Sequence, residues 1–245
     1  MGATDATGKP GSDAWQLKLG IIVPSWNTVM EYEWQQLAGD AISVHSQRIR
    51  HQADTEADLA WLSTQAPEAA GLLAHARVQA ICHGCTASGF LKSPEADLAQ
   101  EAELTGATGI PTVTSSASIV RALRAIGASR ISVASPYEAW LNDKLATYLG
   151  AAGFELLAMK GLGTQAHGSI STATVKALAL EVVRPETQAI FISCSNFRTL
   201  DILAEVEQET GIPVVTSNQA ALWGTLRAIG DRRALPGAGR LFGLA

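Results

Sequence analysis

Two cysteines stand at places where a thiol can take part in catalysis. Cys85 follows the apolar run of ICHGC, Cys194 follows that of FISC, and each precedes Thr, Ser or Asn and then helical sequence. A turn from a strand into a helix exposes unpaired backbone N–H groups, which lower the pKa of a neighbouring thiol and can also hold a carboxylate. Cys85 and Cys194 are therefore the candidate catalytic residues.

Two thiols on opposite faces of a small acid suit three kinds of reaction. In racemisation, one thiolate removes a proton beside a carboxylate and the other thiol returns one to the opposite face. In cis–trans isomerisation, one thiolate adds to an activated double bond and the other thiol protonates the neighbouring carbon. In decarboxylation, a single thiol protonates the enediolate that remains. None of the three needs a cofactor, and the two cysteines alone leave them open.

The remaining cysteine, Cys82, forms a C-x-x-C with Cys85. A zinc site would need a second pair of ligands, and the five histidines show no H-x3-5-H spacing. A redox pair would normally open a helix within a thioredoxin-like pattern. We interpret Cys82 as a small apolar residue inside a strand, and we predict no metal and no cofactor.

The composition favours an α/β protein with a large core. The 245 residues are 47% hydrophobic and 17% charged, with a net charge of −5 and no basic run. Nucleic acid is therefore not an expected partner. No apolar stretch approaches the roughly 18 residues of a membrane span, and the N-terminus lacks a secretory apolar region. We predict a cytoplasmic protein whose residues 1–17, small and polar, form a disordered leader.

Short Val- and Ile-rich runs alternate with amphipathic segments along the rest of the chain. Continuous apolar runs are typical of parallel strands covered on both faces, and the alternation indicates a doubly wound α/β architecture. The predicted strands are LGIIVP (19–24), AISVHS (41–46), VQAICHG (78–84), PTVTS (111–115), RISVAS (130–135), FELLAMK (154–160), QAIFIS (188–193) and PVVTS (213–217).

The chain also repeats itself. GIPTVTSSASIVRALRAIG (109–127) matches GIPVVTSNQAALWGTLRAIG (211–230) with one residue inserted, and each copy follows a helix and a strand that runs into a cysteine. A repeat of this length predicts two similar Rossmann-like lobes related by a pseudo-two-fold axis. Each lobe should hold a mostly parallel four-stranded sheet flanked by helices. We assign residues 18–115 and 218–245 to lobe 1, and residues 116–217 to lobe 2.

The two lobes should present their binding loops to each other. Ligands of open parallel sheets bind beyond the carboxyl ends of the strands, where the two cysteines lie. Four loops should therefore meet at one cleft, with Cys85 and Cys194 on opposite sides. The four loops are Ser25–Trp26–Asn27, Cys85–Thr86–Ala87–Ser88, Ser135–Pro136–Tyr137 and Cys194–Ser195–Asn196.

Four phrases carry a resemblance to a known family. VPSWNTVMEYEW, ICHGCTASGF, VASPY and ISCSNFRTL resemble the Asp/Glu racemase superfamily, and within it the group of maleate cis–trans isomerases and arylmalonate decarboxylases. The resemblance extends over about residues 18 to 230. It implies that Cys85 is the nucleophile that adds to the olefin and that Cys194 is the general acid. The substrate-binding residues that we expect are Ser25, Asn27, Thr86, Ala87, Tyr137, His167, Ser195 and Asn196.

The same resemblance bears on which reaction is native. Arylmalonate decarboxylases keep only the second cysteine and have glycine at the first position, whereas this chain has both. In the loop after the second lobe's second strand, maleate isomerases carry an asparagine where this chain has His167, and Trp26 replaces a small residue of the opening motif. His167 can still bind a carboxylate, and Trp26 can narrow the pocket or simply pack.

The sequence thus predicts a cofactor-free isomerase of a small cis-dicarboxylate such as maleate. The alternatives are a racemase of a small amino acid or 2-substituted acid, and an arylmalonate-type decarboxylase. A sensor or ligand-binding protein without turnover is the alternative from another class. Relatives in the superfamily form dimers or tetramers, so a homo-oligomer is expected as well.

Overall fold

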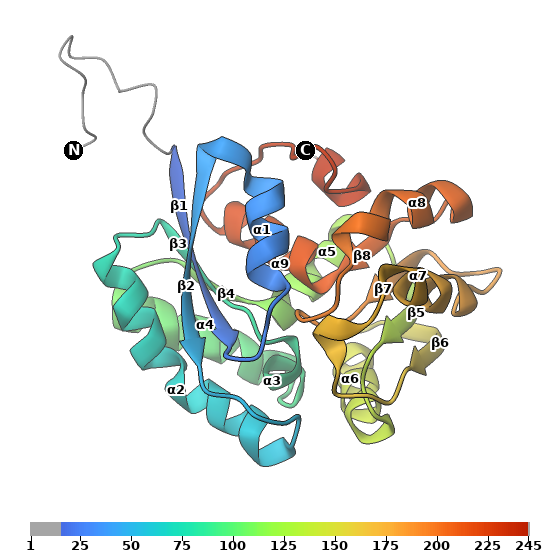
Figure 1. Cartoon of the computed structure of the whole chain (residues 1–245), viewed down its shortest axis with the longest axis horizontal. Helices are drawn as coiled ribbons and strands as arrows, with labels where there is room; N and C mark the ends of the chain where they lie inside the picture. Colours follow the sequence, from blue (N-terminus) through green and yellow to red (C-terminus); the bar gives the residue numbers. More distant parts are fainter. Residues whose placement is uncertain (1–15, 245) are drawn as a thin grey trace, which may run out of the picture.

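Each of the eight predicted apolar runs overlaps a strand in the computed structural model, which describes residues 16–244 (Figure 1). The predicted leader lies outside the described residues except for Gln16 and Leu17, and Leu17 already belongs to β1. The strands are β1 (Leu17–Pro24), β2 (Ile42–Ile49), β3 (Ala80–His83), β4 (Thr112–Thr114), β5 (Arg130–Ser135), β6 (Glu155–Gly161), β7 (Ala189–Ile192) and β8 (Val214–Thr216).

The strands form two separate four-stranded sheets. Their orders are β2-β1-β3-β4 and β6-β5-β7-β8, and every pairing is parallel. The second order reproduces the first with each strand four places later in the chain. Because parallel neighbours need crossover connections, helices separate the strands along the sequence. The α/β class and the two related sheets predicted from the repeat are confirmed.

The helices fill these crossovers and complete the layers around the sheets. Two of them, α5 and α9, contact each other and lie between the two sheets (Figure 1). The α-helices are α1 (Met30–Ala38), α2 (Glu56–His75), α3 (Thr86–Phe90), α4 (Pro94–Thr108), α5 (Ser115–Ala125), α6 (Ala139–Ala151), α7 (Thr172–Glu181), α8 (Leu200–Thr210) and α9 (Ser217–Ala228). Short 3-10 turns span Gly39–Ala41, His167–Ser169 and Arg240–Gly243. Within residues 16–244, no helix combines the length and apolar character that a membrane span requires.

The repeated phrase has the same structural role in both halves. Gly109 and Gly211 end α4 and α8 with φ of 69° and 72°, a left-handed conformation that glycine adopts without a Cβ clash. A short buried strand follows each glycine. Thr114 and Thr216 then cap α5 and α9, because each side-chain oxygen accepts from a backbone N–H three residues on. The repeat therefore encodes a helix end, a strand and a helix start.

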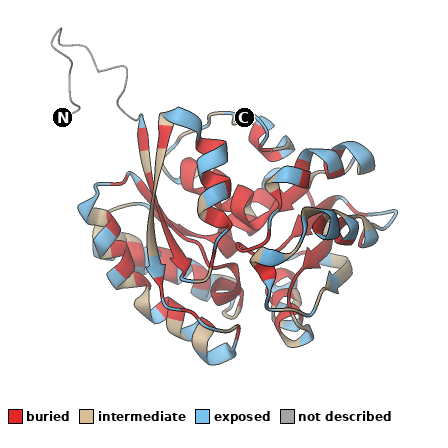
Figure 2. Ribbon diagram, in the orientation of Figure 1, coloured by how far each residue is buried: buried red, intermediate tan, exposed pale blue. Residues whose placement is uncertain are grey.

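The core runs through both sheets and the helices between them. Figure 2 shows that the inner strands and α9 are almost entirely buried, whereas the outer helices keep an exposed face. The edge strands β2 and β6 are mostly of intermediate burial. Ile21, Ile22, Ile190 and Phe191 have no exposed surface. Each such side chain stabilises the fold by about 1.5–3 kcal/mol relative to leaving it in water. This core fixes the strand ends from which the functional loops begin.

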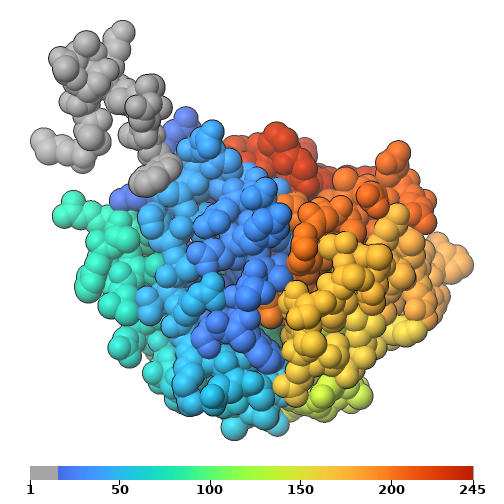
Figure 3. Space-filling model, viewed as in Figure 1, coloured from blue at the N-terminus to red at the C-terminus, as the bar shows by residue number. Residues whose placement is uncertain are grey.

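The two halves adjoin along one boundary, where atoms from early in the chain meet atoms of its second half (Figure 3). α9 contacts β3 and β4 of the first sheet, although it follows the last strand of the second. α5 contacts α3 and β8. These contacts place α9 beside the first sheet, whereas the turn Arg240–Gly243 contacts β8 of the second. The division into lobes stays a prediction.

Candidate active site

A small cavity opens where the carboxyl ends of the two sheets face each other. About 280 Å³ of space free of protein atoms lies within it, and part of this space is open to solvent. Its walls come from the loops that follow β1, β2, β3, β5, β6 and β7, as expected for ligand sites of open parallel sheets. The lining residues are Pro24, Trp26, Asn27, His51, Asp54, Cys85, Thr86, Ala87, Tyr137, His167, Cys194, Ser195 and Asn196. The structure thus brings both cysteines to the same cavity.

Cys85 stands at the start of α3 and is buried. The sequence predicted that N–H groups at this helix start lower the thiol pKa, and those of Ala87 and Ser88 do so, but burial outweighs them. Burial raises the pKa of Cys85 to about 11, although the Ser88 hydroxyl and N–H groups of the next turn lower it. The Asp54 carboxylate adds to the effect of burial, because a thiolate beside it would be a second negative charge. Cys85 is therefore a thiol in the empty site at neutral pH.

Cys194 has a backbone conformation that few residues other than glycine adopt. Its φ is 109°, a strained value that costs roughly 1–3 kcal/mol. The turn is held by Cys194 N, which donates to Ser217 Oγ at 2.9 Å, and by Asn196 N, which donates to the sulfur at 3.4 Å. Burial, with the carboxylate of Asp54 nearby, raises the pKa of the Cys194 thiol. A thiol that keeps its proton suits the role of a general acid.

Three of the predicted binding residues join the two halves across the cavity. Asn27 Nδ2 donates to Ser195 Oγ at 3.1 Å, and Thr28 N donates to Asn196 Oδ1 at 2.9 Å. The Oδ1 atom of Asn27 also accepts from the N–H groups of Val29, which precedes α1, and of Met30, its first residue. The loop after β1 and the loop after β7 therefore set each other's position.

Thr86, Ala87 and Tyr137 line the cavity as predicted. The Thr86 hydroxyl is buried and has no hydrogen-bond partner within the described residues, so it is free to bind a ligand. Tyr137 Oη accepts from Ser193 Oγ at 3.4 Å, and burial raises the pKa of this phenol well above its usual value. Tyr137 is thus a neutral donor at the wall formed after β5.

Ser25 is the one predicted binding residue that the structure does not bring to the cavity. It is exposed, and its hydroxyl accepts from His51 N at 3.0 Å and donates to His51 O at 3.3 Å. Ser25 therefore holds the loop after β2 in place, and through that loop it positions His51. Its contact with the site is indirect.

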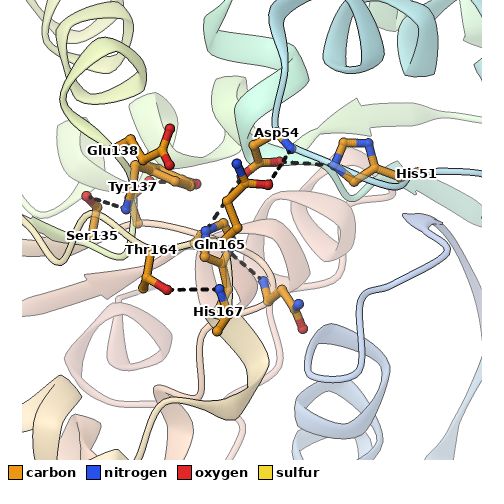
Figure 4. A network of polar contacts seen from close by, with 12 residues as sticks. His51, Asp54, Ser135, Tyr137, Glu138, Thr164, Gln165 and His167 are labelled. Atoms are coloured by element: carbon orange, nitrogen blue, oxygen red, sulfur yellow. Dashed lines mark hydrogen bonds and ion pairs between the residues drawn. The ribbon is translucent and has the colours of Figure 1, made fainter.

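His167 lies deep in the site, and it brings together two residues that sequence reasoning missed. Its Nδ1 lies 3.5 Å from Cys194 Sγ, and its Nε2 lies 3.6 Å from Asp54 Oδ2. Asp54 Oδ1 is in turn 3.0 Å from His51 Nε2. Figure 4 shows Asp54 between the two imidazole rings. Within residues 16–244, no group of three or more His, Cys, Asp or Glu side chains has the arrangement of a metal site.

A signal for Asp54 was present in the sequence. The loop after β2 reads HQAD (51–54) and the loop after β6 reads TQAH (164–167), so Asp54 and His167 end similar phrases in corresponding loops of the two halves. The pseudo-two-fold predicts that such residues approach each other, as the two cysteines do. Extending the repeat to this loop pair would have added Asp54 and His51 to the site.

Trp26 forms an aromatic wall of the cavity. Its ring meets His51 edge-on with 4.7 Å between centroids, and it meets His167 edge-on at 5.7 Å. Trp26 therefore has both roles that the sequence suggested, since its indole packs on the two histidines and also narrows the pocket.

Glu33 links the halves behind the site. It is buried, and its carboxylate accepts from Thr199 N at 2.6 Å, Leu200 N at 2.8 Å and Asn218 Nδ2 at 2.7 Å. Glu33 lies on α1, whereas Thr199 and Leu200 form the start of α8. Because α8 follows the Cys194 loop, this contact fixes the position of that loop relative to the first sheet.

We expect Glu33→Ala to lower the free energy of unfolding by roughly 3 kcal/mol or more, because it leaves three buried donors without an acceptor at about 1–3 kcal/mol each. Chemical denaturation measures the change. Glu31→Ala is the matched control on the same helix, since its ion pair with Arg48 is partly exposed and contributes about 1 kcal/mol or less. Equal stability of the two variants would contradict the role given to Glu33.

Two parallel sheets that bring a cysteine from each half to one cavity define a two-lobed cysteine enzyme. The chain belongs to the arylmalonate decarboxylase family, whose sequence profile matches residues 19–242. Arylmalonate decarboxylase from Bordetella bronchiseptica is 33% identical over 163 residues, which cover 64% of this chain and 68% of that protein. Maleate isomerase from Nocardia farcinica is 29% identical over 238 residues, 91% of this chain and 94% of that protein.

Solved structures agree with this assignment. A cysteine-to-serine mutant of Nocardia farcinica maleate cis-trans isomerase, with a covalently bound succinylcysteine intermediate, superimposes with a TM-score of 0.88 at 27% identity over 92% of this chain and 98% of that chain. A liganded mutant of arylmalonate decarboxylase gives a TM-score of 0.87 at 27% identity over 94% and 100% of the two chains. The predicted fold and the predicted group of maleate isomerases and arylmalonate decarboxylases are confirmed.

Proposed function

We propose that this protein is a cofactor-free cis–trans isomerase of maleate or a similar small cis-dicarboxylate. The observation that carries the proposal is the presence of two buried cysteines, one from each half, at a single small cavity. The covalent succinylcysteine in the relative from Nocardia farcinica supports it, because a cysteine adduct of this kind follows from thiolate addition to maleate.

The reaction can be written with the two sulfurs in different roles. The Cys85 thiol first releases its proton to solvent. The resulting thiolate adds to one olefinic carbon, and the Cys194 thiol gives its proton to the other, so the double bond becomes a single bond. Rotation about that bond brings the carboxylates to opposite sides. The Cys194 thiolate then takes the proton back, the C–S bond breaks with its electrons returning to sulfur, and the trans acid leaves. Thr86, Asn27, Ser195 and backbone N–H groups supply donors for the carboxylates.

The test is proton NMR of the protein with maleate in deuterated buffer. We expect the olefinic signal of maleate to decrease as the signal of fumarate appears. A spectrum that stays unchanged at high protein concentration would exclude maleate as the substrate.

A second candidate is decarboxylation of an arylmalonate, which the indole of Trp26 favours because an aromatic wall suits an aryl substituent. Phenylmalonate separates the two functions, since its decarboxylation gives phenylacetate with a new proton on the α-carbon. Racemisation would instead exchange the α-hydrogen of a small acid for deuterium without changing its constitution.

The substrate that we propose is thus a small carboxylic acid. We also propose a cytoplasmic location, because the reducing conditions there keep both thiols free. The homo-oligomer implied by the resemblance stays a prediction.

A further inference from the structure

The charges that line the cavity do not match an anionic ligand. Among the lining residues there is no Lys or Arg, and Asp54 supplies a negative charge. Helix starts and hydroxyl groups offer partial compensation. A carboxylate removed from water without a counter-charge is nevertheless costly, by several kcal/mol. The lining groups that can become cations are His51 and His167.

The position of His167 makes it the better candidate for this cation. The residue is 3% exposed and lines the cavity between Cys194 and Asp54. Its Nε2 has no hydrogen-bond partner among residues 16–244, and the nearest carboxylate oxygen, Asp54 Oδ2, is 3.6 Å away. A buried ring nitrogen left without a partner is rare, and a small movement of the ring would complete the bond to Asp54.

Asp54 is itself held in place to receive that bond. Its Oδ1 lies 3.0 Å from His51 Nε2, and its backbone N–H donates to Gln165 Oε1 at 3.3 Å. Gln165 belongs to the same loop as His167, two residues earlier. The loops after β2 and β6 are therefore tied together at the point where the carboxylate meets the ring.

Several titratable groups face His167 from the surrounding elements. Asp54 and His51 come from the loop after β2, Cys194 from the loop after β7, and Tyr137 and Glu138 from the turn before α6. Burial lowers the pKa of His167, and the Asp54 carboxylate opposes this effect only in part. The ring is therefore neutral in the empty cavity at neutral pH. A carboxylate ligand would add a second negative charge beside it.

We propose that His167 takes up a proton when a carboxylate ligand enters the cavity, and that the imidazolium then stands as the cation between Asp54, the ligand and the Cys194 sulfur. The proton comes from solvent and binds a ring nitrogen, so that Nε2–H faces Asp54 and Nδ1–H faces Cys194 Sγ. In this form Nδ1–H stabilises a thiolate on Cys194, which makes the Cys194 thiol a stronger acid toward the substrate. This proposal depends on the proposed function only in taking the ligand to be a small carboxylic acid.

Calorimetric titration tests the proposal without turnover. Succinate, which has no double bond to accept a thiolate, is added to the unaltered protein, and maleate is added to Cys85→Ser. Each titration is repeated at neutral pH in buffers of different ionisation enthalpy, which gives the number of protons bound with the ligand. We expect uptake of about one proton. Because the bound form holds a proton that the free form lacks, affinity should fall as pH rises above the pKa of free His167, by roughly tenfold per unit.

His167→Asn is the decisive variant, because an amide keeps a hydrogen-bond donor but cannot take a proton. We expect it to lose both the proton uptake and the pH dependence of affinity, whereas His51→Asn should keep them. Binding without proton uptake in the parent, or uptake that persists in His167→Asn, would overturn the proposal. Proton uptake on binding, with no fumarate formed from maleate by the unaltered protein, would support the role of His167 and contradict the proposed isomerase function. If neither acid binds, both proposals fail.

Discussion

Replacing Cys85 with serine is expected to abolish formation of fumarate from maleate, with a loss of roughly 10³-fold or more in kcat. A serine hydroxyl has a far higher pKa than a thiol and is a much weaker nucleophile toward an olefin. Among residues 16–244, no His, Asp or Glu is hydrogen-bonded to the side chain at position 85 to activate it as in serine hydrolases. The rate is followed by proton NMR. Circular dichroism should show an unchanged fold, because serine occupies nearly the same volume as cysteine.

Cys82→Ala provides the matched control. Cys82 is fully buried in β3, three residues from Cys85, and its sulfur lies 3.9 Å from Ser115 Oγ, away from the cavity. We expect this variant to keep its turnover and to lose about 1 kcal/mol of stability from the missing sulfur. Retained activity in Cys85→Ser would contradict the nucleophile assignment, and loss of activity in Cys82→Ala would show that the effect is not specific to Cys85.

The sequence predicts well the features that depend on neighbouring residues in the chain, namely the strands, the helix ends and the two cysteines. Short apolar runs marked all eight strands, and several of the runs are continuous because a parallel strand inside a sheet is covered on both faces. The repeat indicated two related sheets, since its glycines and threonines specify helix ends and helix starts wherever they occur. The two cysteines were found because each follows such a strand directly.

The residues that the sequence did not predict depend on contacts between distant segments. Glu33 reads as an acid in the first turn of α1, yet its carboxylate caps α8, which begins about 170 residues later. His51 and Asp54 read as polar loop residues, because nothing near them in the chain shows that His167 lies opposite. The raised pKa of Cys85 likewise depends on burial, which is set by the whole fold rather than by the local turn.

The two halves share a framework but differ in chemistry at equivalent positions. Asp54 and His167 occupy matching loops, and so do Cys85 and Cys194. The strained φ and the neighbouring imidazole are found at Cys194. Cys85 instead has its contacts with the first turn of α3. A symmetrical scaffold thus holds two different thiols, which suits one nucleophile and one acid better than two interchangeable bases.

That asymmetry predicts the outcome of Cys194→Ser. The variant should stop turnover after the first step, because the hydroxyl cannot act as the thiolate that removes the proton and lets the C–S bond break. Addition to Cys85 should still occur, with a proton supplied slowly from solvent, so a succinyl adduct should accumulate on Cys85. Intact-protein mass spectrometry should show an increase equal to the mass of maleic acid, and peptide mapping should locate it.

The double variant Cys85→Ser/Cys194→Ser is the control for this trapping, and it should show no increase in mass. An adduct found on Cys82, or on both Cys85 and Cys194 in the parent protein, would indicate nonspecific alkylation of thiols by maleate. An adduct on Cys194 in Cys85→Ser would reverse the two roles. If Cys85 attacks the olefin and Cys194 moves the proton, the adduct should accumulate on Cys85 alone and only when Cys194 is absent. The reason is that loss of the Cys194 sulfur leaves the C–S bond to Cys85 formed but prevents its cleavage.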